Sequence, residues 1–255
     1  MTAAMARLLA SSAARATRWF AFSRWVCLVL LRVFYRLERS GSHNIPATGP
    51  VLIVANHQSY LDPPIVGVMC MHRALHFVAR LGLFENRFFS WLITSYNSIP
   101  IRENTGDIAA MKEAIRRLER GAAVLIFPEG SRTEDGAMTE FKRGISILLK
   151  RASCPVVPVA IEGAFESWPR GRRWPRLFGT RLAARAGEAI SHDELLKDGA
   201  DAALRRLESV IDGMRLELRA EIRGSTRGKF PPVGRADVRS YSSESSSVDE
   251  SARTE

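Results

Sequence analysis

The chain has 255 residues, of which 46% are hydrophobic, and it carries a formal net charge of +10. This length suffices for one sizeable domain with additional segments, but two domains of ordinary size would be a tight fit. The positive charge predicts acidic partners, such as phosphorylated substrates, nucleic acid or an anionic membrane surface. Cys27, Cys70 and Cys154 lack the spacing of a disulfide framework or a zinc site, which favours a reducing compartment.

Residues 1–39 form a basic segment with seven arginines and no acidic residue before Glu38. Helical spacing places most of the later arginines on one side and apolar residues on the other. This pattern predicts an amphipathic helix that lies on a membrane as a peripheral or monotopic element, at the cytoplasmic face. Its longest uncharged run, Trp25–Leu31, is too short to cross ~30 Å of hydrocarbon. A core helix and a cleavable transit peptide over Met1–Arg18 are the alternatives.

Residues 40–223 alternate short apolar runs with helix-like segments, which predicts an α/β domain. The expected strands are Val51–Ala55, Leu75–Ala79, Ile99–Ile101, Ala122–Phe127 and Val156–Ile161. The expected helices are Ile65–Met71, Phe84–Thr94, Ile108–Arg120 with Asp107 as its N-cap, Ile145–Arg151, and a long closing helix that contains Leu204–Ile222. We expect a central, mostly parallel or mixed sheet flanked by helices. The aromatic face of Phe84–Thr94 belongs either to the core or to a groove for an acyl chain.

A histidine and an aspartate follow directly on the first expected strand. Residues 56–59 read Asn-His-Gln-Ser, and Asp62 lies five residues beyond His57. Neutral imidazole accepts a proton near neutral pH, and a carboxylate fixes its tautomer. A continuous helix would point the two side chains to different faces, so a turn must bring them together. The pattern predicts a general base with its orienting carboxylate. The alternative is an ordinary polar turn in which Asp62 caps the following helix.

Three further segments combine an apolar run with proline, small or charged residues. They are Ser98–Arg102, the segment from Ala122 to Thr133, and Val156–Val159. Together with residues 56–62, and in this order, they resemble the glycerolipid acyltransferase family, which includes the 1-acylglycerol-3-phosphate acyltransferases. The resemblance covers roughly Ile45–Glu188. It is specific because an Asn-His-x-Ser-x-x-Asp block and a Phe-Pro-Glu-Gly-Ser-Arg block occur in the same chain.

The resemblance implies a role for each residue that matches the family's pattern. His57 and Asp62 correspond to the catalytic pair. The residues expected to bind the acceptor and its phosphate are Arg102, Glu129, Gly130, Ser131 and Arg132, with Lys142 as a further phosphate contact. Guanidinium groups bind phosphate by paired hydrogen bonds, and glycine exposes backbone amides. Because these residues follow strands, we expect His57, Arg102 and Glu129 at one edge of the sheet. The histidines show no metal-ligand spacing, so no metal or redox cofactor is expected.

These features predict a membrane-associated acyltransferase. It would move a fatty acyl group from acyl-CoA or acyl carrier protein, as co-substrate, to the 2-hydroxyl of lysophosphatidic acid, giving phosphatidic acid for phospholipid biosynthesis. The alternatives are acylation of another lysolipid or of glycerol 3-phosphate, hydrolysis of the thioester, and a non-catalytic basic protein that binds membrane or nucleic acid. No nucleic-acid motif occurs, so nucleic acid is not an expected partner.

Two segments outside the matching blocks have distinctive compositions. Gly163–Gly179 is a basic loop with two tryptophans, either a solvated insertion or a contact to lipid headgroups. In residues 224–255 the periodicity stops and the content of Gly, Pro and Ser rises, which predicts a disordered tail.

Overall fold

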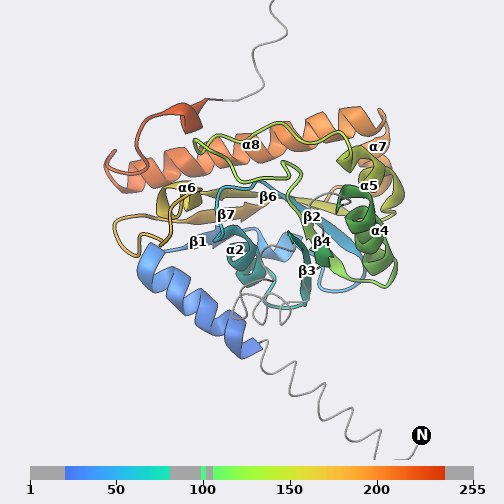
Figure 1. The fold of residues 1–255 in the computed structure, drawn as a ribbon, viewed down its shortest axis with the longest axis horizontal. Helices are drawn as coiled ribbons and strands as arrows, with labels where there is room; N and C mark the ends of the chain where they lie inside the picture. The colour runs from blue at the N-terminus through green and yellow to red at the C-terminus, as the bar shows by residue number, and fades with distance from the viewer. Residues whose placement is uncertain (1–20, 81–98, 102–105, 239–255) are drawn as a thin grey trace, which may run out of the picture.

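The computed structural model describes residues 21–80, 99–101 and 106–238 (Figure 1). Its centre is a seven-stranded sheet in the order β1-β7-β6-β2-β5-β3-β4. The strands are β1 (Glu38–Ser40), β2 (Val51–Ala55), β3 (Leu75–Arg80), β4 (Ile99–Ile101), β5 (Ala123–Ile126), β6 (Val156–Glu162) and β7 (Ala183–Ala186). Each described pair of neighbours is parallel except β6 and β7, which are antiparallel. The predicted mostly parallel or mixed sheet is therefore confirmed.

Strand β2 lies at the centre because both of its faces are buried. Alternate side chains point to opposite faces, so Ile53 packs in one hydrophobic cluster while Leu52 and Val54 pack in the other. In the register, Ile53 lies opposite Leu125 of β5 and Val157 of β6. An unbroken apolar run is typical of a strand that is buried on both sides, as β2 is.

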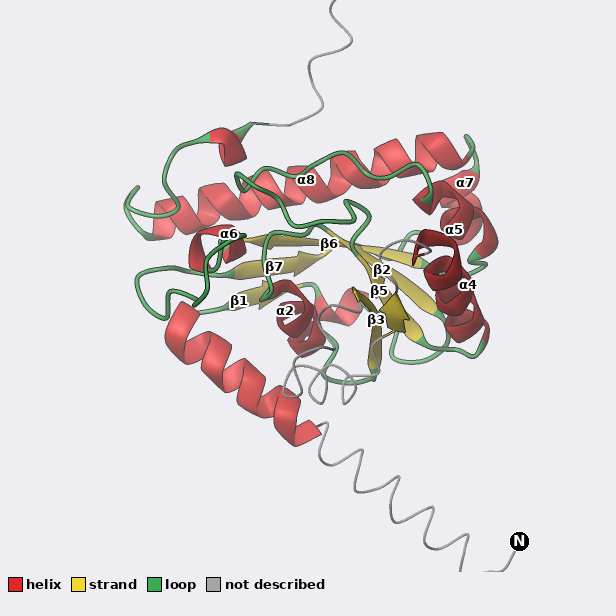
Figure 2. Cartoon of the chain, viewed as in Figure 1, coloured by secondary structure: helices red, strands yellow, loops and turns green. Residues whose placement is uncertain are grey.

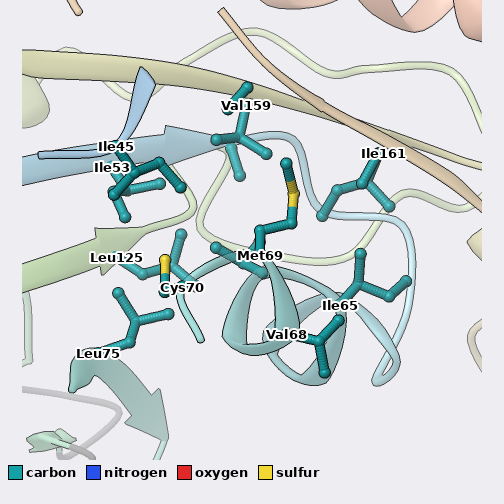
Figure 3. Close-up of a cluster of buried hydrophobic side chains, with 14 of the residues drawn as sticks. Ile45, Ile53, Ile65, Val68, Met69, Cys70, Leu75, Leu125, Val159 and Ile161 are labelled. Atoms are coloured by element: carbon teal, nitrogen blue, oxygen red, sulfur yellow. The ribbon is translucent and has the colours of Figure 1, made fainter. Parts of the chain in front are cut away.

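Helices cover both faces of the sheet (Figure 2). They are a helix over residues 21–35, α2 (Asp62–Met69), α4 (Gly106–Glu119), α5 (Ile145–Arg151), α6 (Ala164–Ser167), α7 (His192–Leu196) and α8 (Ala200–Ser225), with short 3-10 helices η1 (Ser42–Asn44) and η3 (Arg235–Asp237). Side chains of α4, α5, α7 and α8 pack on one face. On the other face lie residues 21–35 and α2, whose Ile65, Val68 and Met69 pack near Ile53 and Val159 (Figure 3).

Two helix starts differ from the prediction. The helix that follows residues 56–61, the histidine turn, begins at Asp62 rather than Ile65. Pro63 and Pro64 occupy its first turn, where a missing N–H leaves no helical hydrogen bond unmade. Helix α4 begins at Gly106, so Asp107 lies inside the helix and is not its N-cap. The predicted helix Phe84–Thr94 lies outside the described residues.

The predicted domain boundaries also shift. Residues 38 and 39, assigned to the amino-terminal segment, belong to β1. At the other end, the boundary after Arg223 is too early, because α8 continues to Ser225 and residues 226–238 pack back against it. Phe230 is buried there, and the Asp237 carboxylate accepts a hydrogen bond from Arg219 at 3.0 Å. Composition alone could not reveal these long-range partners.

The helix over residues 21–35 has two different faces. Leu28, Leu31 and Tyr35 are buried in the cluster that contains α2, and Arg24 Nη1 donates a hydrogen bond to the Cys70 carbonyl at 2.9 Å. The opposite face exposes large apolar side chains, namely Phe22, Trp25, Val29, Leu30 and Val33. The helix is therefore docked on the domain by one face only. Among the described residues, no helix has the length and apolar character needed to cross a membrane.

Candidate active site

His57 and Asp62 meet at the carboxyl end of β2. His57 Nδ1 lies 2.7 Å from Asp62 Oδ2. The same oxygen accepts the backbone N–H of Gln58 at 2.6 Å and of Ser59 at 2.7 Å. The chain between the two residues therefore wraps around the carboxylate as a turn, as expected from their spacing. Asp62 itself is the first residue of α2.

The environment of this pair holds the imidazole in one orientation. The Asp62 side chain is fully buried, while that of His57 is 19% exposed. Burial raises the pKa of Asp62, and the hydrogen bonds from His57, Ser59 and Gln58 oppose that rise. When Nδ1–H donates to the carboxylate, the neutral ring keeps an acceptor lone pair on Nε2. Phe127 stacks on the ring at 4.1 Å between centroids and 17° between planes, which limits its rotation.

Glu129, at the end of β5, supports the backbone of His57. Its Oε1 accepts the His57 N–H at 2.6 Å, and its Oε2 accepts the N–H and the hydroxyl of Thr139 at 2.8 and 2.7 Å. On the other side, the Thr133 N–H donates to the His57 carbonyl at 2.9 Å. Burial raises the pKa of Glu129 to about 7, although the donors from Thr139 and His57 lower it. Both oxygens of Glu129 thus accept hydrogen bonds from the protein itself, and its predicted contact to the acceptor stays a prediction.

The other predicted binding residues lie around the same loop. Gly130 has φ 71°, and a Cβ atom there would fall 2.5 Å from Lys142 Nζ. The Lys142 ammonium therefore lies directly over the glycine, and an added Cβ atom would displace it. The Arg132 guanidinium carbon lies 3.6 Å from the ring centroid of Tyr60, beside the histidine turn. Ser131, the residue between Gly130 and Arg132 in the sequence, is half-buried.

Arg102 is the one predicted site residue outside the described part of the chain. Strand β4 ends one residue before it, at Ile101. Because β4 runs parallel to β3, and β3 to β5, its carboxyl end lies at the edge that carries Glu129. The predicted contact of Arg102 with phosphate remains a prediction.

Gln58 connects the histidine turn to a neighbouring strand, and sequence reasoning gave it no role. Its Oε1 accepts the backbone N–H of Ala164 and Phe165 at 3.1 and 3.3 Å. Its Nε2 donates to the Gly136 carbonyl at 3.2 Å and to Glu162 Oε2 at 3.1 Å. All four hydrogen-bonding positions of this buried amide are therefore used.

Glu162, at the end of β6, belongs to a buried ion cluster. Its carboxylate lies 2.5 Å from Arg219 Nη1 and 3.4 Å from Arg215 Nη1, and all three side chains are at most 3% exposed. Burial, followed by the charge of Glu166, raises the pKa of Glu162 to about 7, while the two arginines lower it. The cluster joins α8 to the strand end beside the histidine turn.

The sequence contained a signal for this cluster. Glu208, Asp212, Arg215 and Arg219 recur at spacings of three and four, so they share one side of α8, and all four are buried. The apolar residues of this helix predict the helix itself but not these buried charges. A charged stripe that follows the buried face indicates partners elsewhere in the chain, since buried charges need compensation.

Comparison with known proteins places this geometry in a family. The family model described as Acyltransferase matches residues 36–162, which include His57, Asp62 and Glu129. The 1-acyl-sn-glycerol-3-phosphate acyltransferase alpha of Ovis aries is 30% identical over 213 residues, covering 77% of this chain and 70% of that protein. The chloroplastic 1-acyl-sn-glycerol-3-phosphate acyltransferase BAT2 of Brassica napus is 28% identical over 141 residues, covering 54% of this chain. This chain spans 40% of the length of that plant protein.

A solved structure agrees with the sequence relatives. The crystal structure of the 1-acyl-sn-glycerophosphate acyltransferase PlsC of Thermotoga maritima superposes with a TM-score of 0.68 at 25% identity, covering 80% of each chain. The likeness thus extends over most of the α/β domain. The chain therefore belongs to the acyltransferase family that includes the 1-acyl-sn-glycerol-3-phosphate acyltransferases.

Proposed function

We propose that this protein is a 1-acyl-sn-glycerol-3-phosphate acyltransferase. It transfers a fatty acyl group from acyl-CoA or acyl carrier protein to the 2-hydroxyl of lysophosphatidic acid, and the product is phosphatidic acid. The observation that carries the proposal is the His57–Asp62 pair, 2.7 Å apart, at the sheet edge where the basic side chains of Arg132 and Lys142 also gather. The names of the relatives supply the acceptor.

The proposed chemistry is general base catalysis. The acceptor's hydroxyl gives its proton to His57 Nε2 while its oxygen attacks the thioester carbonyl carbon. The tetrahedral adduct then collapses with cleavage of the C–S bond, and the imidazolium returns the proton to the departing thiolate. Asp62 keeps the Nδ1–H in place and stabilises the transient positive charge. No serine nucleophile is needed, since the thioester is already activated.

The acceptor's phosphate requires positive charge beside this base. Lys142 supplies an ammonium group above Gly130, and Arg132 supplies a guanidinium group held against Tyr60. Arg102 is the third proposed contact. A guanidinium can bind two phosphate oxygens at once, which would fix the glycerol backbone and its 2-hydroxyl relative to His57.

We also propose that the protein associates with a membrane, at its cytoplasmic face. The exposed apolar side chains of the helix over residues 21–35 support this proposal, and Arg32 and Arg36 are exposed next to them. Lysophosphatidic acid is an amphiphile, so an enzyme that lies on the bilayer meets it at high local concentration. No metal or redox cofactor takes part in the proposed reaction.

The test compares the wild type with His57→Ala in the full chain. Thiol release and labelled phosphatidic acid are measured with lysophosphatidic acid and either acyl-CoA or acyl carrier protein as donor carrier. We expect product from the wild type and a fall of about 10²–10⁴-fold in kcat for His57→Ala. His43→Ala, which changes an exposed histidine, is the control and should retain activity.

Three outcomes would change the proposal. Activity with another lysolipid or with glycerol 3-phosphate alone would keep the chemistry and replace the acceptor. Free fatty acid formed in place of lipid product would identify a thioesterase. Absence of both products with every donor and acceptor, from a folded protein, would favour a non-catalytic binding protein.

A further inference from the structure

The loop that follows α6 exposes large apolar side chains among arginines. Trp174 is 69% exposed, Phe178 is 71% exposed, and Leu177 is exposed between them. Residues 168–179 contain no acidic residue and four exposed arginines, Arg170, Arg172, Arg173 and Arg176. A single exposed apolar side chain is ordinary, but three of them within five residues form a patch that needs an explanation.

This loop is continuous with the exposed face of the amino-terminal helix. The Phe178 ring meets the Phe34 ring edge-on, with centroids 5.3 Å apart. Phe34 lies four residues after Leu30, so the two share a side of the helix, and Leu30 belongs to its exposed apolar face. In Figure 1 the loop lies beside the end of this helix that leads into β1. Loop and helix therefore present one surface, the loop-helix surface, made of Trp25, Val29, Leu30, Val33, Trp174, Leu177 and Phe178.

The start of the same loop contacts the histidine turn. The Ser59 hydroxyl donates to the Trp168 carbonyl at 2.9 Å. The Trp168 ring meets the Tyr60 ring edge-on at 5.3 Å, and Tyr60 in turn carries the Arg132 guanidinium on its face. The loop thus spans from the proposed acceptor site to the loop-helix surface.

We propose that residues 168–178 are a second lipid-contacting element, which inserts Trp174, Leu177 and Phe178 among the headgroups of an anionic phospholipid bilayer. The bilayer would lie against the loop-helix surface, and the arginines would contact lipid phosphates. Through Trp168, the loop then holds the histidine turn at the bilayer surface, where an amphiphilic acceptor resides. The acceptor part of this inference rests on the proposed function, whereas the binding to lipid does not.

The charge of the loop selects an anionic bilayer as the partner. Arginine and tryptophan together suit the headgroup layer, where an apolar ring and a cation are both accommodated. The Arg173 guanidinium lies 5.7 Å from the Trp174 ring centroid, so the two side chains already form such a pair. Near an anionic leaflet, each arginine should strengthen binding about fivefold, and salt should weaken it.

Vesicle binding by the full chain tests the proposal directly. We measure cosedimentation with phosphatidylcholine vesicles that contain or lack phosphatidylglycerol. Trp174→Ser with Phe178→Ser should weaken binding at least tenfold. The control is Val233→Ser with Val238→Ser, which removes two exposed apolar side chains of the carboxyl-terminal segment and should change binding less than twofold. Binding by the loop variant within twofold of the wild type would overturn the proposal.

A second series tests the charge. The triple variant combines Arg172→Gln, Arg173→Gln and Arg176→Gln. It should weaken binding to vesicles with phosphatidylglycerol by about a hundredfold, and should have little effect on binding to vesicles without that lipid. If this variant loses no more affinity than a triple variant of exposed basic residues outside the loop, Lys150, Arg151 and Lys229, then only net charge matters and the proposal fails.

Activity measurements separate this inference from the proposed function. The loop variant should lose at least tenfold activity toward acceptor embedded in vesicles, and should match the wild type with a short-chain acceptor dissolved as monomers. If the wild-type protein acylates no acceptor, the proposed function is refuted. The vesicle-binding measurements would still show whether the loop contacts lipid. A dimer that dissociates in the loop variant, with unchanged vesicle binding, would identify a second copy as the occupant instead.

Discussion

Two buried charge clusters lie at the ends of the neighbouring strands β2 and β6, and the protein encloses them to different degrees. In the first, His57 keeps 19% of its side chain exposed above the fully buried Asp62. In the second, Glu162, Arg215 and Arg219 are all at most 3% exposed. The first can exchange a proton with a bound molecule, whereas the second satisfies its charges only within the protein. Gln58 joins them, since its N–H reaches Asp62 and its amide reaches Glu162.

The largest effect should come from Asp62→Asn, which breaks the His57–Asp62 pair. The amide matches the carboxylate in shape but carries no charge, so it cannot stabilise the imidazolium that forms during transfer. We expect kcat to fall about 10³-fold while the protein stays folded. Thiol release at saturating substrate measures kcat, and urea unfolding shows whether the protein stays folded. Asp198→Asn, in an exposed loop, is the control, and an Asp62→Asn variant within tenfold of it would refute this role.

Arg219→Met should break the enclosed cluster. It removes one partner of Glu162, of Glu166 at 2.8 Å and of Asp237 at 3.0 Å. The buried Glu162 carboxylate then keeps only the longer contact to Arg215, at 3.4 Å. The free energy of unfolding should fall by about 3–5 kcal/mol. Arg185→Met is a matched control, because Arg185 pairs with the exposed Glu217 and Glu221 and should contribute only about 0–1 kcal/mol.

The double variant Arg219→Met with Glu162→Gln sharpens this test. Replacing the Glu162 carboxylate, which has lost one cationic partner, by a neutral amide should restore part of the lost free energy of unfolding. Urea unfolding of the two single variants and the double variant measures this as a double-mutant cycle. If Arg219→Met and Arg185→Met lose the same free energy of unfolding, burial of the ion cluster does not increase its contribution to stability.

Glu129→Gln should have a smaller effect on activity. An amide NH₂ in place of one oxygen would meet an N–H or hydroxyl donor of His57 or Thr139 and displace the histidine turn. We expect kcat to fall about tenfold with little change in KM, since an unsatisfied buried donor costs about 1–3 kcal/mol. A rise in KM alone would favour the direct acceptor contact implied by the family resemblance. Glu134→Gln, an exposed change in the same loop, is the control.

The same variant should alter how stability depends on pH. The pKa of Glu129 is raised from 4.5 to about 7 in the folded protein, so the folded state binds more protons than the unfolded state between these values. Its contribution to stability is present below pH 4.5 and is lost as pH rises toward 7. Urea midpoints at pH 4.5 and 7 should therefore differ less in Glu129→Gln than in the wild type. Glu162 contributes a slope of the same sign, which both proteins retain.

Gly130→Ala should have the smallest effect. Gly130 and Gly171 both have positive φ, 71° and 85°, but only Gly130 has Lys142 within reach of an added Cβ. Both alanine variants should lose about 1 kcal/mol of stability through backbone strain. Only Gly130→Ala should raise the KM for the acceptor, by a few-fold, since the displaced Lys142 leaves its place over the loop. Equal KM values in the two variants would argue against a phosphate contact by Lys142.

The sequence predicted the features that depend on local pattern or on a short separation. Apolar runs identified the strand Val51–Ala55 and the helix Ile145–Arg151, because one buried element needs only its own residues to be apolar. The five-residue spacing of His57 and Asp62 required a turn, and the structure contains it. The extent of the ordered chain was misjudged, since Phe230 and Asp237 are held by α8 rather than by neighbours in sequence.

The supporting contacts of the candidate site could not be predicted for the same reason. Gln58 donates a hydrogen bond to Glu162, more than a hundred residues away. Glu129, which follows β5, accepts a hydrogen bond from the backbone of His57, which follows β2. A residue's own type does not reveal which distant backbone group it will contact. Sequence pattern therefore located the residues proposed to react, and only the folded chain located those that hold them in place.

The carboxyl-terminal segment has a consequence for the order in which the protein matures during synthesis. Arg215 donates to the Ala236 carbonyl, and Asp237 pairs with Arg219 and Arg223. A ribosome releases Glu162 well before these arginines, and the arginines before Asp237. The nascent chain can form the central strands early, but the charges behind the histidine turn reach their final partners only when residue 237 has left the exit tunnel. A ribosome stalled shortly before that point would display a domain with its sheet assembled and this cluster incomplete.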